Sequence, residues 1–227
     1  MVGARTTSEV AVVGHPFAPI GMGEHARSAF RALKAAHVQV SLVDIYGMDR
    51  GKDADFEREY GPYVRQGLGP DINFFCINGD EVDQALGLLS AEAFRDAYNI
   101  IYPAWELSKY PAEWARKLEL FDEVWGCSDF VRGALQDALG RPIANLPQAV
   151  DLRLSGFLGR RYFGIPENAV VYLFAFDFSS YPARKNPGAV LDAFETLVAA
   201  RPDAPVHCVI KSKGGAPDHP DRRALQA

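Results

Sequence analysis

The stretch Val10-Ala11-Val12-Val13-Gly14 decides the fold of this chain. A short continuous apolar run that ends in glycine is typical of a strand buried on both faces, as the strands of parallel sheets are. A loop with Pro16 and Pro19 follows, and residues 23–36 then carry apolar side chains along one helical stripe. A strand, a loop and an amphipathic helix in this order predict an α/β fold.

The alternation of strand and helix continues along most of the chain. Apolar, β-branched or aromatic runs predict five further strands at residues 38–45, 71–77, 98–103, 122–127 and 142–146. Helical spacing is found between several of them, through Val82, Leu86 and Leu89, through Trp114 and Leu118, and through Val131 and Leu135. This order predicts a parallel sheet with helices on both faces. We therefore expect one complete Rossmann-like domain over residues 1–150.

A second α/β pattern begins after a predicted linker at residues 147–156. It has strands at 170–176 and 206–211, a helix at 187–199, and polar, turn-rich sequence from Gly214 onward. Two strands and one long helix leave the faces and edges of a sheet uncovered. Residues 151–227 are therefore expected to be a linker and the incomplete start of a second domain, in a truncated polypeptide.

Composition and charge exclude several classes of protein. The chain has 227 residues, of which 48% are hydrophobic and 23% charged, so it is neither disordered nor collagen-like. The net charge of -5 argues against nucleic acid as the principal partner, because such binders carry a basic excess. The 3 cysteines are widely separated and suit a reducing compartment. Without a predicted signal peptide or transmembrane segment, the chain is expected to be cytoplasmic, with peripheral membrane contact left open.

The loop before the first predicted helix contains two glycines that could serve a ligand. Gly21 and Gly23 form a G-x-G-x-x-A pattern, and Asp44 closes the second predicted strand, as in dinucleotide-binding folds. In those folds the first glycine sits at the strand end, whereas here Gly14 ends the strand and residues 15–20 intervene. Three interpretations stay open: a nicotinamide site, a mobile glycine loop that admits another ligand, and a simple turn into the helix.

Two further loops follow predicted strands, at the edge where open α/β sheets bind ligands. The first carries Trp105, which is suited to packing, and Glu106, an acid among aromatic residues. Such an acid is suited to proton transfer or to binding sugar hydroxyls, or else caps the next helix. The second loop ends at Ser128, a predicted N-cap whose helix N-terminus could also bind an anion. His15 and His25 flank the glycine loop without metal-ligand spacing, and a role for them there is a further possibility.

The sharpest local signal is the sequence Arg184-Lys185-Asn186-Pro187, which follows a predicted buried strand. Asn186 is a favoured N-cap and Pro187 a favoured first helical residue. Two cations therefore precede a helix N-terminus, and together these groups are suited to a diphosphate. A solvated pair of loop cations is the alternative. Lys211 closes the next predicted strand and could face the same cleft.

Four segments, taken together, resemble the family 4 retaining glycosyltransferases of the GT-B fold. They are residues 21–27 (GMGEHAR), 105–111 (WELSKYP), 122–128 (DEVWGCS) and 177–187 (DFSSYPARKNP). They occur in the family's order and extend over nearly the whole chain. The resemblance implies two Rossmann-like domains facing a cleft, of which the first binds the acceptor and the second a nucleotide-diphosphate sugar. This chain then holds one complete Rossmann-like domain and the incomplete start of the second.

The resemblance and the sequence positions described above together suggest roles for individual residues. The donor-binding residues are Arg184, Lys185, Gly21, Gly23 and Lys211. The catalytic candidate is Glu106, and the acceptor side carries His25, Trp105 and Ser128. No metal or other cofactor is expected, because cations and a helix N-terminus stabilise the leaving phosphate.

The implied reaction is transfer of a sugar, with retention, to a glycan, lipid-linked or small-molecule acceptor. Many family members separate the arginine from the lysine, whereas here the two are adjacent. The family's downstream pair of glutamates would lie beyond residue 227, so the chain alone is expected to be inactive. A nicotinamide-dependent oxidoreductase built on the glycine loop and Asp44 is one alternative, and a non-catalytic α/β binding module is the other.

Overall fold

The computed structural model divides the chain into two compact units, Met1–Leu152 (unit 1) and Arg153–Ala227 (unit 2). The structure describes residues 8–47, 53–151, 156–178, 182–214 and 222. Parts of three predicted segments lie outside the described residues. They are residues 152–155 of the linker, residues 179–181 before the Arg-Lys pair, and residues 215–221 and 223–227 of the polar tail.

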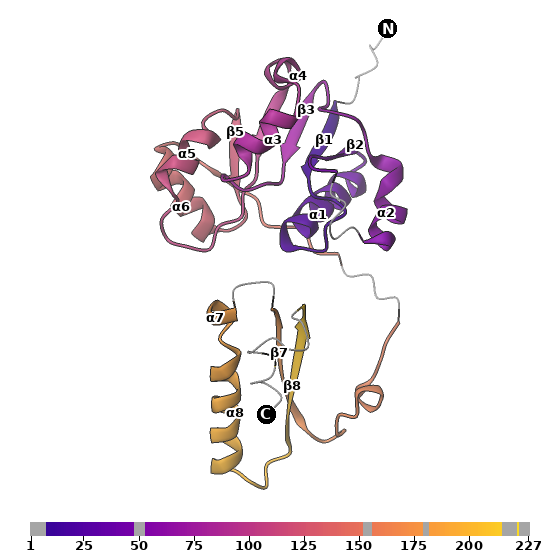
Figure 1. The fold of residues 1–227 in the computed structure, drawn as a ribbon, viewed down its shortest axis with the longest axis vertical. Coiled ribbons are helices and arrows are strands. Elements are labelled where there is room, and N and C mark those ends of the chain that lie inside the picture. The colour runs from indigo at the N-terminus through magenta and orange to yellow at the C-terminus, as the bar shows by residue number, and fades with distance from the viewer. Residues whose placement is uncertain (1–7, 48–52, 152–155, 179–181, 215–221, 223–227) are drawn as a thin grey trace. The chain divides into compact units, whose positions relative to one another are not determined.

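Unit 1 is built around a six-stranded sheet whose strands all run parallel, in the order β2-β1-β3-β4-β5-β6 (Figure 1). The strands are β1 Glu9–Gly14, β2 Gln39–Asp44, β3 Ile72–Phe75, β4 Tyr98–Ile101, β5 Glu123–Gly126 and β6 Ala144–Asn145. The predicted α/β class with a Rossmann-like parallel sheet is therefore confirmed. Several strands are shorter than predicted because apolar sequence continues into buried loops: Cys76 and Ile77 are fully buried although β3 has ended.

Six α-helices of unit 1 are described. They are α1 Gly21–Ala35, α2 Ala54–Tyr60, α3 Val82–Leu88, α4 Ala91–Asp96, α5 Ala112–Leu118 and α6 Asp129–Leu139, with a 3-10 turn at Gly61–Tyr63. The sequence did not predict α2 or α4, which are short and depend on their caps. Asp53 accepts hydrogen bonds from two amides of α2, and Ser90 accepts one from Ala93 of α4. No helix among the described residues is long and apolar enough to cross a membrane.

Both faces of the sheet are buried, as the opening apolar run predicted. Ala11, Val12 and Val13 are fully buried, because β1 lies between β2 and β3 and its side chains alternate between the faces. Val13 belongs to a core cluster with residues of α3, α5 and α6. Val12 belongs to a second cluster with residues of α1 and α2. The helices thus cover opposite faces of one sheet.

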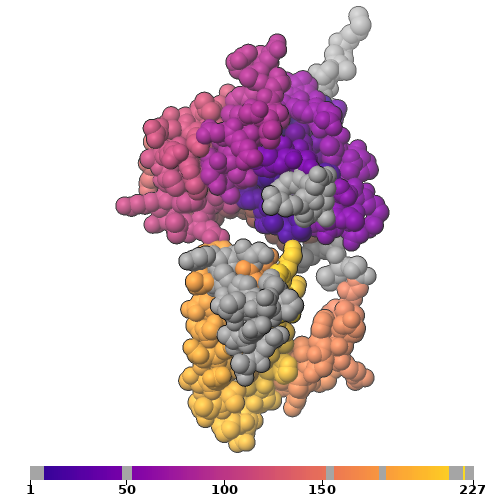
Figure 2. Space-filling model, viewed as in Figure 1, coloured from indigo at the N-terminus to yellow at the C-terminus, as the bar shows by residue number. Residues whose placement is uncertain are grey.

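Unit 2 contains two parallel strands, β7 Val170–Asp177 and β8 Val206–Lys213, and two helices, α7 Pro182–Lys185 and α8 Pro187–Ala200. Both strands extend beyond their predicted ends, to Asp177 and Lys213, because the pairing continues in register between these two residues. A 3-10 turn at Arg160–Phe163 stands off from the strands (Figures 1 and 2). The aromatic side chains on and beside it are exposed: Phe157, Tyr162 and Phe163.

Candidate functional site

The carboxyl edge of the unit 1 sheet gathers the loops that the sequence marked as ligand-binding. All six strands are parallel, so the loops that follow them emerge at one edge. From β1 the chain crosses to β2 on one side, while β3 lies on the other side. Such a switch of direction leaves a crevice at the carboxyl ends of the two central strands, which is where open α/β sheets bind ligands.

The glycine loop is not a tight dinucleotide turn. Strand β1 ends at Gly14, α1 begins at Gly21, and residues 15–20 separate the two glycines. A Cβ atom at Gly23 would overlap the carbonyl oxygen of Ala18, whereas one at Gly21 would meet nothing within 4 Å. Gly23 is therefore required by the close approach of its own loop. Gly21 faces open space.

Hydrogen bonds from α1 hold the glycine loop, which argues against the predicted mobile loop. The buried Arg27 side chain donates from Nη1 to the carbonyl oxygens of Pro16 and Ala18, at 2.9 and 3.0 Å. Its Nε donates to Glu24 at 3.1 Å, and its guanidinium stacks 3.8 Å from the ring centroid of Phe56 on α2. One side chain of α1 thus holds both the loop and a neighbouring helix.

His25 is engaged by the protein on both ring nitrogens. Its Nε2 donates to the Tyr102 carbonyl oxygen at 2.8 Å, and its Nδ1 accepts from the side-chain amide of Gln148. Burial lowers the pKa of His25, although the bond to Tyr102 opposes this. The ring also lies 4.2 Å from the Tyr102 ring, centroid to centroid. His25 therefore links α1 to the end of β4, and both of its ring nitrogens have partners within the protein. Its predicted place on the acceptor side stays a prediction.

The loop after β4 carries Trp105 and Glu106. Trp105 donates from Nε1 to the Lys109 carbonyl oxygen at 3.0 Å and packs edge-on against Tyr110 and Trp114. Glu106 is exposed in the same loop. This loop is tied to the one after β3, because the Asn78 side chain accepts from the Ala104 amide at 3.1 Å. Glu106 thus lies on the surface of a loop anchored at the carboxyl edge.

Ser128 caps α6, as the sequence predicted. Its hydroxyl oxygen accepts from the Val131 amide at 3.2 Å. Asp44 ends β2 and pairs in register with Gly14 of β1. Asp44 at the end of β2 and Ser128 after β5 therefore lie at the same edge of the sheet as the glycine loop.

Sequence reasoning missed a hydrogen-bond partner for His15. The Nε2 atom of His15, which directly follows β1, lies 2.6 Å from Oε1 of Glu81, the N-cap residue of α3. The Tyr46 ring stacks on the imidazole with centroids 4.8 Å apart. These three residues follow β1, β3 and β2, so the parallel sheet brings them together. The strand order was the only signal that could have found them.

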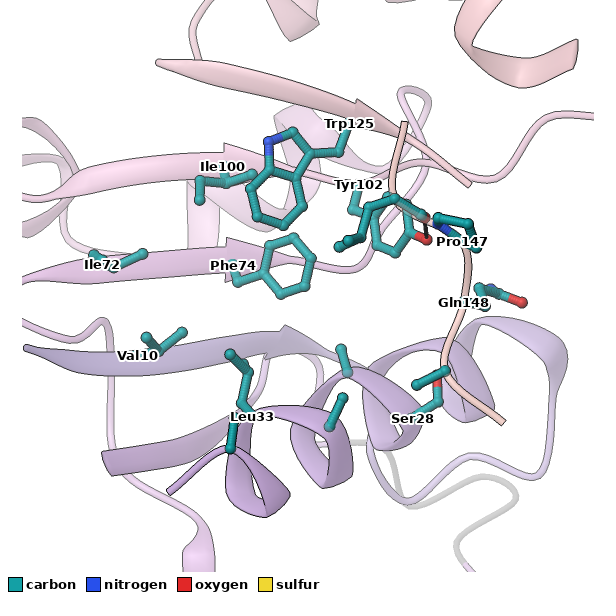
Figure 3. A pocket seen from close by; sticks show the side chains of 15 residues that line it. Val10, Ser28, Leu33, Ile72, Phe74, Ile100, Tyr102, Trp125, Pro147 and Gln148 are labelled. Carbon is teal, nitrogen blue, oxygen red and sulfur yellow. Dashed lines mark hydrogen bonds between the residues drawn. The ribbon is translucent and has the colours of Figure 1, made fainter. Parts of the chain in front are cut away.

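An apolar groove of about 440 Å³ lies on the sheet face that α1 covers (Figure 3). The rings of Phe74, Tyr102 and Trp125 form its floor, and Leu33 of α1 faces them. The Tyr102 hydroxyl donates to the Leu146 carbonyl oxygen. Because the polar atom of this ring already has a protein partner, the groove offers mainly van der Waals contact.

In unit 2 the structure brings Arg184, Lys185 and Asn186 together at the start of α8. Asn186 has a φ of 48°, and its side chain accepts from the Ala189 amide at 3.4 Å, so it is the N-cap that the sequence predicted. Arg184 is exposed and Lys185 half-buried. Arg184 and Lys185 are the last two residues of the one-turn helix α7 and do not lie in an irregular loop.

Lys211 does not end its strand. It pairs in register with Ala175, and β8 continues to Lys213. The predicted strand end at Lys211 is therefore wrong by two residues, because polar residues extend the pairing. That Lys211 faces the cleft stays a prediction.

Among the described residues, no group of histidine, cysteine, aspartate or glutamate side chains is arranged to hold a metal ion. No protein-family model matches the chain, and no curated protein matches its sequence.

Proposed function

We propose that this protein is a retaining glycosyltransferase of the GT-B type. In this proposal unit 1 holds the acceptor, and unit 2 begins the domain that binds the nucleotide-diphosphate sugar. The sugar's bond to the phosphate oxygen breaks, and the nucleoside diphosphate leaves. The acceptor oxygen forms the new glycosidic bond on the same face of the sugar, and its proton passes to the departing diphosphate.

The observation that carries the proposal is the arrangement before α8. Arg184 and Lys185 directly precede a helix of 14 residues whose N-terminus is capped by Asn186. The positive end of the helix dipole and two adjacent cations favour a group that carries several negative charges. A diphosphate is such a group, and it gains further negative charge as it leaves the sugar. Stabilising that charge is the largest contribution a protein can make to this chemistry without a metal.

The carboxyl edge of unit 1 has the opposite character. Asp44 ends β2, Asp80 and Glu81 follow β3, and Glu106 follows β4. Carboxylates repel a diphosphate, but they accept hydrogen bonds from hydroxyl groups. This contrast supports a division in which unit 1 takes a hydroxyl-bearing acceptor and unit 2 takes the phosphates.

The spacing of the glycine loop weighs against a nicotinamide-dependent oxidoreductase. A dinucleotide fold needs its first glycine at the strand end, so that the helix N-terminus reaches the pyrophosphate. Here residues 15–20 separate the end of β1 from the start of α1. Arg27 holds this loop in place.

Calorimetric titration of the chain with UDP-, GDP- and ADP-sugars beside NAD tests the proposal. A charge-assisted bond to phosphate contributes about 1.5–3 kcal/mol, so Lys185→Ala and Arg184→Ala should each weaken sugar-nucleotide binding about ten- to hundredfold. Arg95→Ala, which removes an exposed cation from α4 before the amino end of β4, is the matched control and should leave binding unchanged. Binding of NAD in preference to every sugar nucleotide would favour the oxidoreductase. Binding of neither class would favour a non-catalytic binding module.

A further inference from the structure

Two histidines are buried in unit 1, and they differ in the hydrogen-bond partners of their ring nitrogens. His25 has a protein partner on each nitrogen, Tyr102 on one and Gln148 on the other. His15, which is 4% exposed, has Glu81 on Nε2, while its Nδ1 is buried and has no hydrogen-bond partner among the described residues. Buried polar atoms in proteins are nearly always hydrogen-bonded. The Nδ1 atom of His15 is therefore a position where a water or a ligand atom is expected.

Glu81 determines which nitrogen of His15 carries the proton. Its Oε2 accepts from the Asn78 amide at 2.9 Å while Oε1 faces His15. Burial alone would raise the pKa of Glu81, but the bonds from His15 and Asn78 outweigh it and lower that pKa. A carboxylate can only accept, so Nε2 of His15 is the donor. In the neutral imidazole Nδ1 then presents a lone pair.

The Tyr46 ring covers the His15 imidazole, and its hydroxyl group can donate a hydrogen bond to a ligand. Its ring is half-buried and stacks on His15 at an angle of 24°, while its hydroxyl oxygen is buried without a partner among the described residues. Burial, with the charges of Glu81 and Asp80, raises the pKa of Tyr46 to about 12. The phenol therefore stays protonated and can donate. A ligand hydroxyl can donate to His15 Nδ1 and also accept a bond from Tyr46.

The position and charge of this cluster limit the class of ligand. His15, Tyr46 and Glu81 follow three adjacent strands at the crevice between β1 and β3. The neighbouring carboxylates of Asp80 and Glu81 disfavour an anion such as a phosphate. A neutral molecule with several hydroxyl groups satisfies the unpartnered atoms without bringing like charges together.

We propose that His15, Glu81 and Tyr46 form a subsite for one hydroxyl group of a neutral, polyhydroxylated ligand, which enters when the Tyr46 side chain turns off the imidazole. The assignment of this ligand as the sugar acceptor rests on the proposed function. The subsite itself is read from the geometry of unit 1 alone.

Side-chain nitrogen NMR of the full chain with labelled histidine tests the subsite. The probes are methyl α-glucoside, methyl α-mannoside and myo-inositol, each titrated to saturation or to its solubility limit. The expected result is that at least one probe shifts the Nδ1 signal of His15 and leaves that of His25 unmoved. Before any probe is added, His15 should show the tautomer that is protonated on Nε2.

Three variants sharpen this test. Tyr46→Phe removes the donor but keeps the ring, and Glu81→Gln removes the charge but keeps the volume. Each should weaken probe binding about tenfold, the effect of one lost hydrogen bond to a well-placed partner. Tyr98→Phe removes an exposed hydroxyl at the amino end of β4 and should change nothing.

The inference is overturned if no probe moves the His15 Nδ1 signal, or if Tyr46→Phe and Glu81→Gln bind the probe as tightly as the parent chain. The same samples are titrated with UDP-glucose and GDP-mannose and observed at the backbone amides of residues 184–189. Failure of those amides to respond counts against the proposed function only. The signal of His15 is read separately from them.

Discussion

Strands β1 and β7 are both apolar and both pair in parallel, yet only β1 is buried. Ala11, Val12 and Val13 are fully buried, whereas Val170 and Leu173 are 57% and 67% exposed. Strand β1 has a paired neighbour on each side and helices over both faces, while β7 pairs with β8 alone among the described strands. An apolar run thus predicts a strand, but its neighbours decide how much burial that strand contributes.

This difference implies that unit 1 holds most of the folding free energy. Burial of apolar surface stabilises in proportion to the area removed from water, and stability differs between parts of a structure accordingly. The three tryptophans, Trp105, Trp114 and Trp125, all lie in unit 1. Their fluorescence therefore reports on unit 1, while circular dichroism reports on both units.

The largest expected effect is the difference in stability loss between a leucine-to-alanine substitution in unit 1 and one in unit 2. Leu42 of β2 is fully buried and Leu173 of β7 is exposed. Leu42→Ala should lower the free energy of unfolding by about 2–5 kcal/mol, through lost burial and a cavity. Leu173→Ala should change it by less than about 0.5 kcal/mol. Urea unfolding, followed by tryptophan fluorescence and by circular dichroism, measures the change in the free energy of unfolding for each variant. Equal losses in the two variants would contradict the proposed difference between the two units.

A smaller difference in stability is expected between alanine substitutions at Gly21 and at Gly23, the two glycines of α1. Gly23→Ala forces a Cβ atom against the Ala18 carbonyl oxygen, so it should cost about 1–3 kcal/mol in unit 1 stability. Gly21→Ala meets open space at the first helical position and should be close to neutral. Tryptophan fluorescence during urea unfolding compares them. If Gly21→Ala proved the more damaging change, the packing explanation for Gly23 would be wrong.

The smallest expected effect is a pH dependence confined to unit 1. The pKa of His25 is lowered from its ordinary value of 6.5, so the unfolded chain binds its proton at a higher pH than the folded chain does. The stability contribution of neutral His25 is thus complete above pH 6.5 and is lost as the pH falls towards the folded pKa. The slope from this one group cannot exceed about 1.4 kcal/mol per pH unit.

Urea unfolding between pH 7 and pH 5, followed by fluorescence, measures this slope. His25→Gln should flatten it, and His207→Gln in unit 2 is the control that should not. An unchanged slope in His25→Gln would mean that another group is responsible.

Local sequence predicted the features whose causes are local. The VAVVG run at residues 10–14 gave a buried strand because it is apolar at every position of both faces. Asn186 and Pro187 gave the start of α8, since an N-cap acts on amides three residues away. The loop length between Gly14 and Gly21 likewise argued correctly against a tight dinucleotide turn.

Features that depend on strand order could not be read from local sequence. His15 and Glu81 are 66 residues apart and meet only because β1 and β3 are neighbours. Gly23 was interpreted as a ligand-binding glycine, although its neighbour is the carbonyl of its own loop. The polar end of β8 was expected to leave the sheet, yet it stays paired with β7 as far as Lys213.

The central claim is that sugar nucleotides bind through the cations before α8, and hydrogen exchange of the full chain tests it most directly. The account predicts that a saturating UDP- or GDP-sugar slows amide exchange at residues 184–189, and that this protection is lost in Lys185→Ala. Protection of residues 21–27 and Asp44 instead, with residues 184–189 unaffected, would contradict the account.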